Sequence, residues 1–327
     1  MYDPIQLSPY GEFFIALCQI NEHSYITFGM RTGDKVEVLA SFGKVFDESA
    51  LGLSFVFWNT AAYVRNESFM FAENREREVK YKAYAITYHH YLAFLHHIKR
   101  LSLQHNSGLR AYCPDPDQPS RLVWKLVANV KTNAKNTDSM DLNEYGRVGL
   151  INNTCRHSAI HLTKQAAHRT DLGKGISSLF FSTPPLAADF LAGKVKKSTP
   201  YFYILPLPPQ AFPGLTPAKH KIINQLYRRL DEIVLCAQKN PITIQKFHKI
   251  KELYNELTRN SKASIFDIMK GIEAWEHDNK DLISKHRKSH WFSFQTATEK
   301  MFVNFHHEFA VLRDELVESH FPNVGNN

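Results

Sequence analysis

The pattern of apolar residues changes near residue 215, and this change constrains the fold more than any other feature. Before it, short segments rich in β-branched and aromatic residues alternate with turn signals, a pattern typical of strands. Beyond Pro217 the apolar residues follow an amphipathic helical spacing in longer segments, at 218–238, 241–258, 262–284 and 293–318. We therefore expect an α+β domain at 1–215, followed by an all-α helical domain at 216–327.

The first domain is predicted to be an antiparallel sheet with packed helices. Its strand-like segments are 12–20, 23–29, 35–42, 122–130 and 201–205. Thr32-Gly33-Asp34 is a hairpin-turn signal, and Leu51–Trp58 is expected to be either a strand or a buried segment. The polar run Glu73–Glu78 is expected to interrupt the core. Amphipathic helices are predicted at 86–103 and from about Cys155 to Ala167.

Composition excludes several classes of protein. With 43% hydrophobic residues in 327, the chain has enough apolar material to bury a core. No apolar run approaches the roughly 20 residues of a membrane-spanning helix, and the N-terminus lacks the basic and apolar regions of a signal peptide. We therefore expect a protein of the cytoplasm in the producing cell, with no transmembrane segment.

Net charge and cysteine content constrain the possible binding partners only weakly. The formal net charge of +8 favours anionic partners, but it is spread along the chain. An anionic lipid surface is therefore one candidate partner, whereas nucleic acid is not expected, and the oligomeric state is left open. The four cysteines form no C-x-x-C pair and are interpreted as free thiols.

Cys155 is the residue that most resembles a reactive group. Thr154 can act as the N-cap of the predicted helix, which places Cys155 at its first position. There the helix dipole and the free N–H groups favour thiolate over thiol. A thiol nucleophile also needs a base, and His23 at the start of a predicted strand is the natural candidate.

A histidine that opens a short strand, followed far downstream by an Asn-x-Cys at a helix start, resembles the circularly permuted papain-like folds. These include the NlpC-type cell-wall peptidases, the lecithin:retinol acyltransferase group and the PPPDE peptidases. The matching segments are Glu22–Gly29 and Tyr145–Ala159, within about residues 10–170. The resemblance implies Cys155 as nucleophile and His23 as base. Thr154 departs from the commoner pattern, in which the cysteine directly follows two asparagines.

Two further residues complete the predicted site. If the hairpin turns at Thr32 to Asp34, the position facing His23 falls near Ser41, with Glu37 less well placed. Ser41 is therefore predicted to orient the imidazole. The side-chain amide of Asn153 is a candidate to stabilise an oxyanion.

The domain arrangement resembles, in style, the type IV secreted effectors of Legionella-type bacteria. Those proteins often join a cysteine fold to a helical C-terminal module through a proline cluster like that at Pro206–Pro209. The resemblance implies translocation into a host cell, with a host protein as substrate or binding partner.

No cofactor or metal is expected. The pairs His157/His161 and His286/His290 have the i, i+4 spacing of zinc helices, but neither carries the glutamate of an H-E-x-x-H motif. Exposed histidines are the favoured interpretation. A P-loop and a G-x-S-x-G motif are both missing from the sequence.

Two hypotheses for function remain open at this point. In the first, the chain is a thiol-dependent hydrolase or acyl/amide transferase, similar to a cysteine protease and acting on peptide or isopeptide bonds. In the second, it is a non-catalytic adaptor whose helical C-terminal domain binds a host protein or an anionic membrane. The amphipathic segments beyond residue 216 and the unusual Thr154 motivate the second hypothesis.

Overall fold

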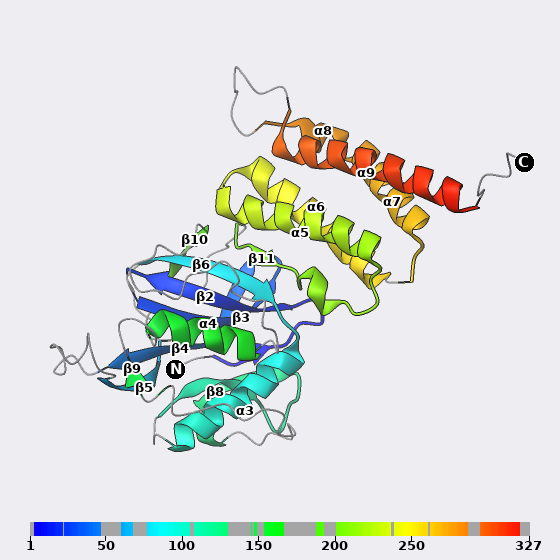
Figure 1. The fold of residues 1–327 in the computed structure, drawn as a ribbon. Helices are drawn as coiled ribbons and strands as arrows, with labels where there is room; N and C mark the ends of the chain where they lie inside the picture. The colour runs from blue at the N-terminus through cyan, green and yellow to red at the C-terminus, as the bar shows by residue number, and fades with distance from the viewer. Residues whose placement is uncertain are drawn as a thin grey trace, which may run out of the picture. The chain divides into compact units, whose positions relative to one another are not determined.

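The structure, a computed structural model, contains two compact units, Met1–Ile204 and Leu205–Asn327. It describes residues 3–21, 23–46, 60–67, 77–104, 108–129, 145, 147–148, 154–166, 188–192, 201–236, 239–260, 262–286 and 295–320. The first unit combines strands and helices and the second is built from helices (Figure 1). The protein is therefore α+β with a C-terminal helical region.

A large sheet, antiparallel along the path from β10 to β9, dominates the first unit. Within the described residues it has eight strands, in the order β10-β6-β2-β3-β4-β5-β9, with β11 also paired to β6. Their bounds are β2 Glu12–Ile20, β3 His23–Thr32, β4 Lys35–Phe46, β5 Thr60–Asn66, β6 Arg77–Ala85, β9 Arg147–Val148, β10 Ala188–Ala192 and β11 Ile204–Leu205. A separate sheet has the order β1-β8-β7, formed by β1 Ile5–Gln6, β8 Arg121–Leu126 and β7 Arg110–Pro114.

The predicted hairpin lies at the centre of the large sheet. The predicted turn is confirmed: Gly33 has a φ of 59°, in the left-handed region that glycine tolerates, and Thr32 pairs with Lys35 across it. Strands β3 and β4 both extend beyond the predicted segments, to Thr32 and Phe46. A β-bulge between Phe28 and Gly29 then shifts the pairing by one residue.

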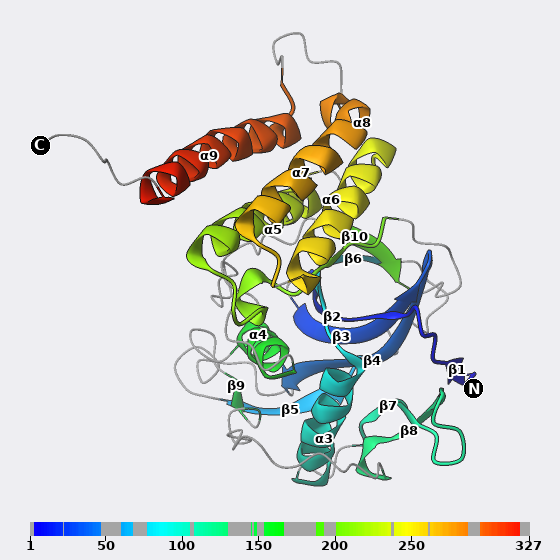
Figure 2. The same ribbon diagram turned by 90° about the vertical axis from the view of Figure 1, so that its right-hand side faces the viewer.

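Two helices, α3 (Tyr88–Gln104) and α4 (Cys155–Ala166), pack in the first unit close to β3 and β4 (Figure 2). Both agree with the predicted segments to within two residues. Helix α3 packs through aromatic side chains, since the Phe94 ring lies 4.3 Å from that of Phe28 and 6.2 Å from that of Phe42. Helix α4 contacts β2, β3 and β4.

Several predicted elements of this unit are wrong in part. Strand β8 ends at Leu126, where a 3-10 turn begins, and only Ile204 and Leu205 of the segment 201–205 form a strand. The backbone at Phe202 and Tyr203 bonds side chains instead, because Arg31 donates to the Phe202 carbonyl and the Tyr203 N–H donates to the Tyr81 hydroxyl. The last two residues of the polar run, Arg77 and Glu78, belong to β6, and residues 73–76 lie outside the described residues. Leu51–Trp58 lies outside the described residues.

The second unit contains α5 (Pro217–Cys236), α6 (Pro241–Arg259), α7 (Ile265–Asp278), α8 (Lys280–Ser284) and α9 (Ala297–His320). The predicted helix 262–284 is therefore two helices. Asn279 ends the first, because its side-chain amide donates to the Trp275 carbonyl at 2.8 Å and its backbone leaves the helical conformation. In the described part of the chain no helix is long and apolar enough to cross a membrane.

The boundary between the units lies at 204/205, not at the predicted 215/216. The intervening proline-rich segment belongs with the helices. The Tyr254 hydroxyl on α6 donates to the Leu207 carbonyl at 2.6 Å, and the Tyr254 ring lies edge-on to that of Phe212. These long-range contacts have no local signature in the sequence.

Candidate active site at Cys155, His23 and Glu67

Helix α4 starts at Cys155 because Thr154 caps it. The Thr154 hydroxyl accepts the His157 N–H at 3.1 Å, and its carbonyl accepts the Ser158 N–H at the same distance. Thr154 is buried, whereas Cys155 is partly exposed. The cap fixes the cysteine at the first helical position, where the positive end of the helix dipole favours an anion.

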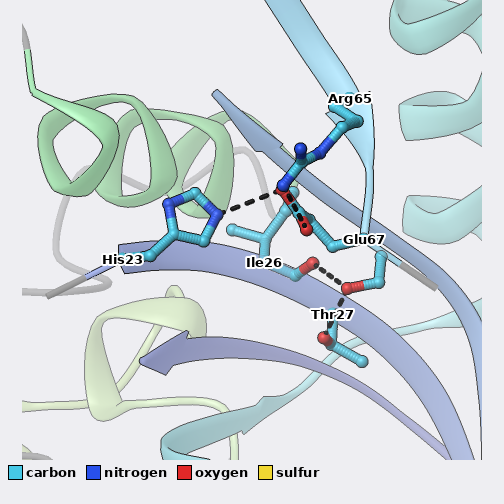
Figure 3. A network of polar contacts seen from close by, with 6 residues as sticks. His23, Ile26, Thr27, Arg65 and Glu67 are labelled. Atoms are coloured by element: carbon cyan, nitrogen blue, oxygen red, sulfur yellow. Dashed lines mark hydrogen bonds and ion pairs between the residues drawn. The ribbon is translucent and has the colours of Figure 1, made fainter. Parts of the chain in front are cut away.

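His23 lies at the first residue of β3, as predicted, and its Nε2 atom is hydrogen-bonded to a residue from another strand. The partner is Oε1 of Glu67, directly after β5, at 3.1 Å (Figure 3). The Glu67 side chain is fully buried, and that of His23 is 26% exposed. The buried carboxylate therefore fixes the Nε2 side of the imidazole ring, while the His23 side chain remains partly exposed to solvent.

The His23 and Cys155 side chains are also hydrogen-bonded to each other. Glu67 engages Nε2, and the other ring nitrogen, Nδ1, points away from Glu67 (Figure 3). The backbone N–H groups of Ser24 and Arg156 also donate to the sulfur. The sulfur thus has three polar partners from two elements.

These contacts shift both ionisations in the direction that favours an ion pair. Burial opposes ionisation of Cys155, but the hydrogen bonds from His23 and from the Ser24 N–H outweigh it, so its pKa is lowered. Burial alone would lower the pKa of His23, yet its hydrogen bonds to Cys155 and Glu67 and their negative charges raise it to about 9. Both shifts favour the thiolate–imidazolium form over the neutral pair.

Glu67 is positioned by contacts from two neighbouring strands. Its backbone N–H donates to the Ser41 carbonyl on β4 at 2.8 Å. Arg65, two residues earlier, donates to both carboxylate oxygens at 3.3 Å. These hydrogen bonds hold the buried carboxylate in place beside His23. The pairing of β4 with β5 therefore decides where the third member of the site lies.

Gly43 on β4 gives His23 and Glu67 the space to meet. A Cβ atom at this position would lie 2.8 Å from Glu67 Oε1 and 2.9 Å from His23 Nε2, closer than real Cβ contacts. Gly43 pairs with Tyr25 on β3 and with Arg65 on β5, so it lies between the strand that begins at His23 and the strand that precedes Glu67. A glycine here is a requirement of the site.

We expect Gly43→Ala to separate His23 from Glu67 while the protein stays folded, because both contacts are with side chains that can move aside. The rate of Cys155 alkylation near neutral pH should fall several-fold, with the free energy of unfolding reduced by about 1–3 kcal/mol. Alkylation kinetics and denaturant unfolding measure the two effects. Gly108→Ala is the matched control, since a Cβ there meets no atom within 4 Å. Equal alkylation rates for both variants would contradict the role given to Gly43.

The structure does not place Ser41 beside His23, so the predicted orienting residue is wrong. Ser41 pairs with Thr27, and its buried hydroxyl contacts the Thr27 hydroxyl at 3.0 Å and the Ile26 carbonyl at 3.1 Å. The prediction failed because the register differs by four residues along β3 from the one assumed. Glu37 pairs with Met30, further away still. Asn153 lies outside the described residues.

The other two cysteines with described side chains are unsuited to nucleophilic chemistry. Cys18 and Cys113 are both fully buried, and burial raises the pKa of each thiol to about 12. Cys155 is the one whose pKa is shifted down. The contrast in pKa separates Cys155 from the two core thiols.

The histidines of α4 and the rest of the described chain offer no metal centre with three or more acidic, histidine or cysteine ligands. His161 is instead hydrogen-bonded through Nδ1 to the Tyr145 hydroxyl at 2.9 Å, and its ring stacks on that of Tyr145. Of the second histidine pair, His286 is described, whereas His290 lies outside the described residues.

Comparisons with protein-family models, with curated proteins and with solved structures found no match for this chain.

Proposed function

We propose that the protein is a thiol-dependent hydrolase or acyl/amide transferase that uses Cys155 as nucleophile and His23 as acid and base. The single observation that carries the proposal is the hydrogen-bonded chain from Cys155 through His23 to Glu67. A buried structural cysteine does not need a depressed pKa, a histidine partner and two backbone donors. This combination supports nucleophilic catalysis.

In the proposed reaction, the Cys155 thiolate attacks the carbonyl carbon of an acyl donor, and the carbonyl π electrons move to oxygen. Backbone N–H groups at the start of α4 lie at the end of the helix that attracts an anion, so they are suited to stabilise this oxyanion. Collapse of the intermediate breaks the bond to the leaving group, which takes a proton from the His23 imidazolium. A thioester remains on Cys155.

The second half of the reaction restores the site. Neutral His23 removes a proton from water or from an acceptor amine or alcohol, whose oxygen or nitrogen attacks the thioester carbon. The bond to sulfur breaks, and the thiolate again faces an imidazolium. Water gives hydrolysis and another acceptor gives transfer, so the same residues serve both reactions. Glu67 would keep the ring oriented and stabilise its positive charge throughout.

The permuted papain-like fold belongs to this proposal. Two features agree with such a permutation. The histidine lies on a central strand that precedes the cysteine in the chain, and the cysteine lies at the start of a helix. A peptide, isopeptide or ester bond of a host protein is the proposed substrate, with translocation into a host cell. The hypothesis of a non-catalytic adaptor gives the pKa shifts at Cys155 and His23 no role. We therefore favour the hypothesis that the protein is an enzyme.

Trapping the thioester tests the proposal directly. Incubation with activated peptide and fatty-acyl esters, followed by acid quenching and intact-mass spectrometry, should show an acyl adduct on the wild type. Cys155→Ala should lose the adduct entirely, whereas Cys18→Ala, which removes a buried thiol, should retain it in folded protein. An adduct that survives Cys155→Ala, or a wild type that no donor acylates, would contradict the proposal.

A further inference from the structure

The helical unit contains a polar cavity of about 430 Å³ between α5 and α9. Four residues of α5 line it from one helix face, because they recur at i, i+3, i+4 and i+7: Gln225, Arg228, Arg229 and Glu232. From α9 it is lined by Lys300, Met301, Asn304, His307 and Glu308. The cavity therefore belongs to the second unit alone and is independent of Cys155.

The acidic residues that line this cavity already have basic or amide partners. Glu308 accepts from Gln225 at 2.8 Å and pairs with Lys221 at 3.1 Å. Glu232 pairs with Arg229 at 2.9 Å, and the buried Arg229 is fixed further by the Thr298 hydroxyl. The carboxylates therefore do not neutralise the remaining cations of the cavity.

Two cations of the cavity are left without an acidic partner. Arg228 and Lys300 are exposed, they lie on opposite helices, and neither makes an ion pair with another residue of the described chain. Asn304 and His307 lie on the same wall as Lys300 and add further hydrogen-bonding groups. A planar guanidinium and a mobile ammonium facing one cavity are a combination that binds phosphate oxygens well.

From this arrangement we infer that the cavity between α5 and α9 binds the phosphate monoester of a small polar molecule. The phosphate lies between Arg228 and Lys300, and the rest of the ligand contacts Asn304 and His307. The cavity volume fits a ligand larger than phosphate alone. Small-molecule sites span roughly 300–1,000 Å³, and a bare phosphate ion fills much less than this cavity. The polar lining favours a sugar or inositol phosphate over an apolar ligand.

The experiment uses the full chain carrying Cys155→Ala, so that its outcome is independent of the proposed catalysis. Calorimetric titrations with glucose 6-phosphate and with inositol 1,4,5-trisphosphate probe a soluble phosphate. Co-sedimentation with phosphatidylcholine vesicles, with and without phosphatidylinositol 4-phosphate, probes a lipid headgroup. Binding of a soluble probe identifies a free phosphate ester as ligand, and binding to the phosphoinositide vesicles alone identifies the headgroup.

Arg228→Gln combined with Lys300→Gln should weaken binding of the responsive probe by tenfold or more. The matched control is Lys262→Gln combined with Lys280→Gln, which removes the same charge from exposed positions outside the cavity. The control should bind as the parent does. Equal weakening in both double variants would show attraction by net charge only and overturn the inference, as would the lack of binding by every probe.

Discussion

Replacing His23 with Asn is expected to slow the alkylation of Cys155 by iodoacetamide at about pH 6.5 by at least tenfold. In the wild type the imidazolium stabilises the thiolate against the cost of burial. Without it, burial remains and the pKa of Cys155 rises. Each unit of that rise reduces the thiolate fraction tenfold at a pH below the pKa.

The measurement follows labelling at Cys155 by peptide mass spectrometry between about pH 5 and pH 10. The wild-type rate should reach half its maximum below pH 9, and the His23→Asn rate at a clearly higher pH. Cys18 and Cys113 serve as internal controls, because their raised pKa values of about 12 keep them protonated throughout this range. His157→Asn, on the first turn of α4, is the matched substitution of a partly exposed histidine. Coincident pH profiles for the wild type and His23→Asn would remove the basis for the proposed pair.

Glu67→Gln should move the alkaline limit of activity to lower pH. The hydrogen bond and the charge of Glu67 help to raise the pKa of His23 to about 9, after the larger contribution of Cys155. The substitution keeps the size of the side chain but removes the charge, so the imidazolium loses its proton at lower pH. At about pH 8.5 we expect activity to fall roughly tenfold, with a smaller loss near neutral pH.

The same ionisations make stability depend on pH with a defined sign. Because the pKa of His23 is raised in the folded state, its contribution is complete below its unfolded value of about 6.5 and is lost as the pH rises through about 9. The lowered pKa of Cys155 contributes above the unfolded value of about 9 and is lost as the pH falls. Glu67→Gln should therefore reduce the amount by which the free energy of unfolding at acidic pH exceeds that at alkaline pH.

A pH profile of acyl transfer, together with urea unfolding at about pH 6 and pH 9.5, tests Glu67 as a positioning residue. Glu37→Gln is the control, because Glu37 forms an ion pair with Lys35 in β4 and not with His23. Glu67→Asp should restore part of the alkaline activity, because it returns the charge with a shorter reach. A uniform loss of activity at every pH would indicate a merely structural role for Glu67.

The helices and the central hairpin could be predicted because their signals are local. Thr154 and His157 are three residues apart, so a cap at Cys155 can be inferred from adjacent residues. Gly33 similarly marks its own turn. By contrast, β10 and β6 pair residues more than a hundred positions apart, and nothing near either strand specifies the partner.

The sequence by itself therefore determined the α+β composition, the start of α4 at Cys155 and the start of β3 at His23. Only the tertiary structure decided that these two residues meet, that Glu67 and not Ser41 supports the imidazole, and that Gly43 leaves room for both. The physical reason lies in the register. A bulge at Phe28 and Gly29 and the pairing of β4 with β5 set which side chains converge, and both depend on packing across the whole sheet.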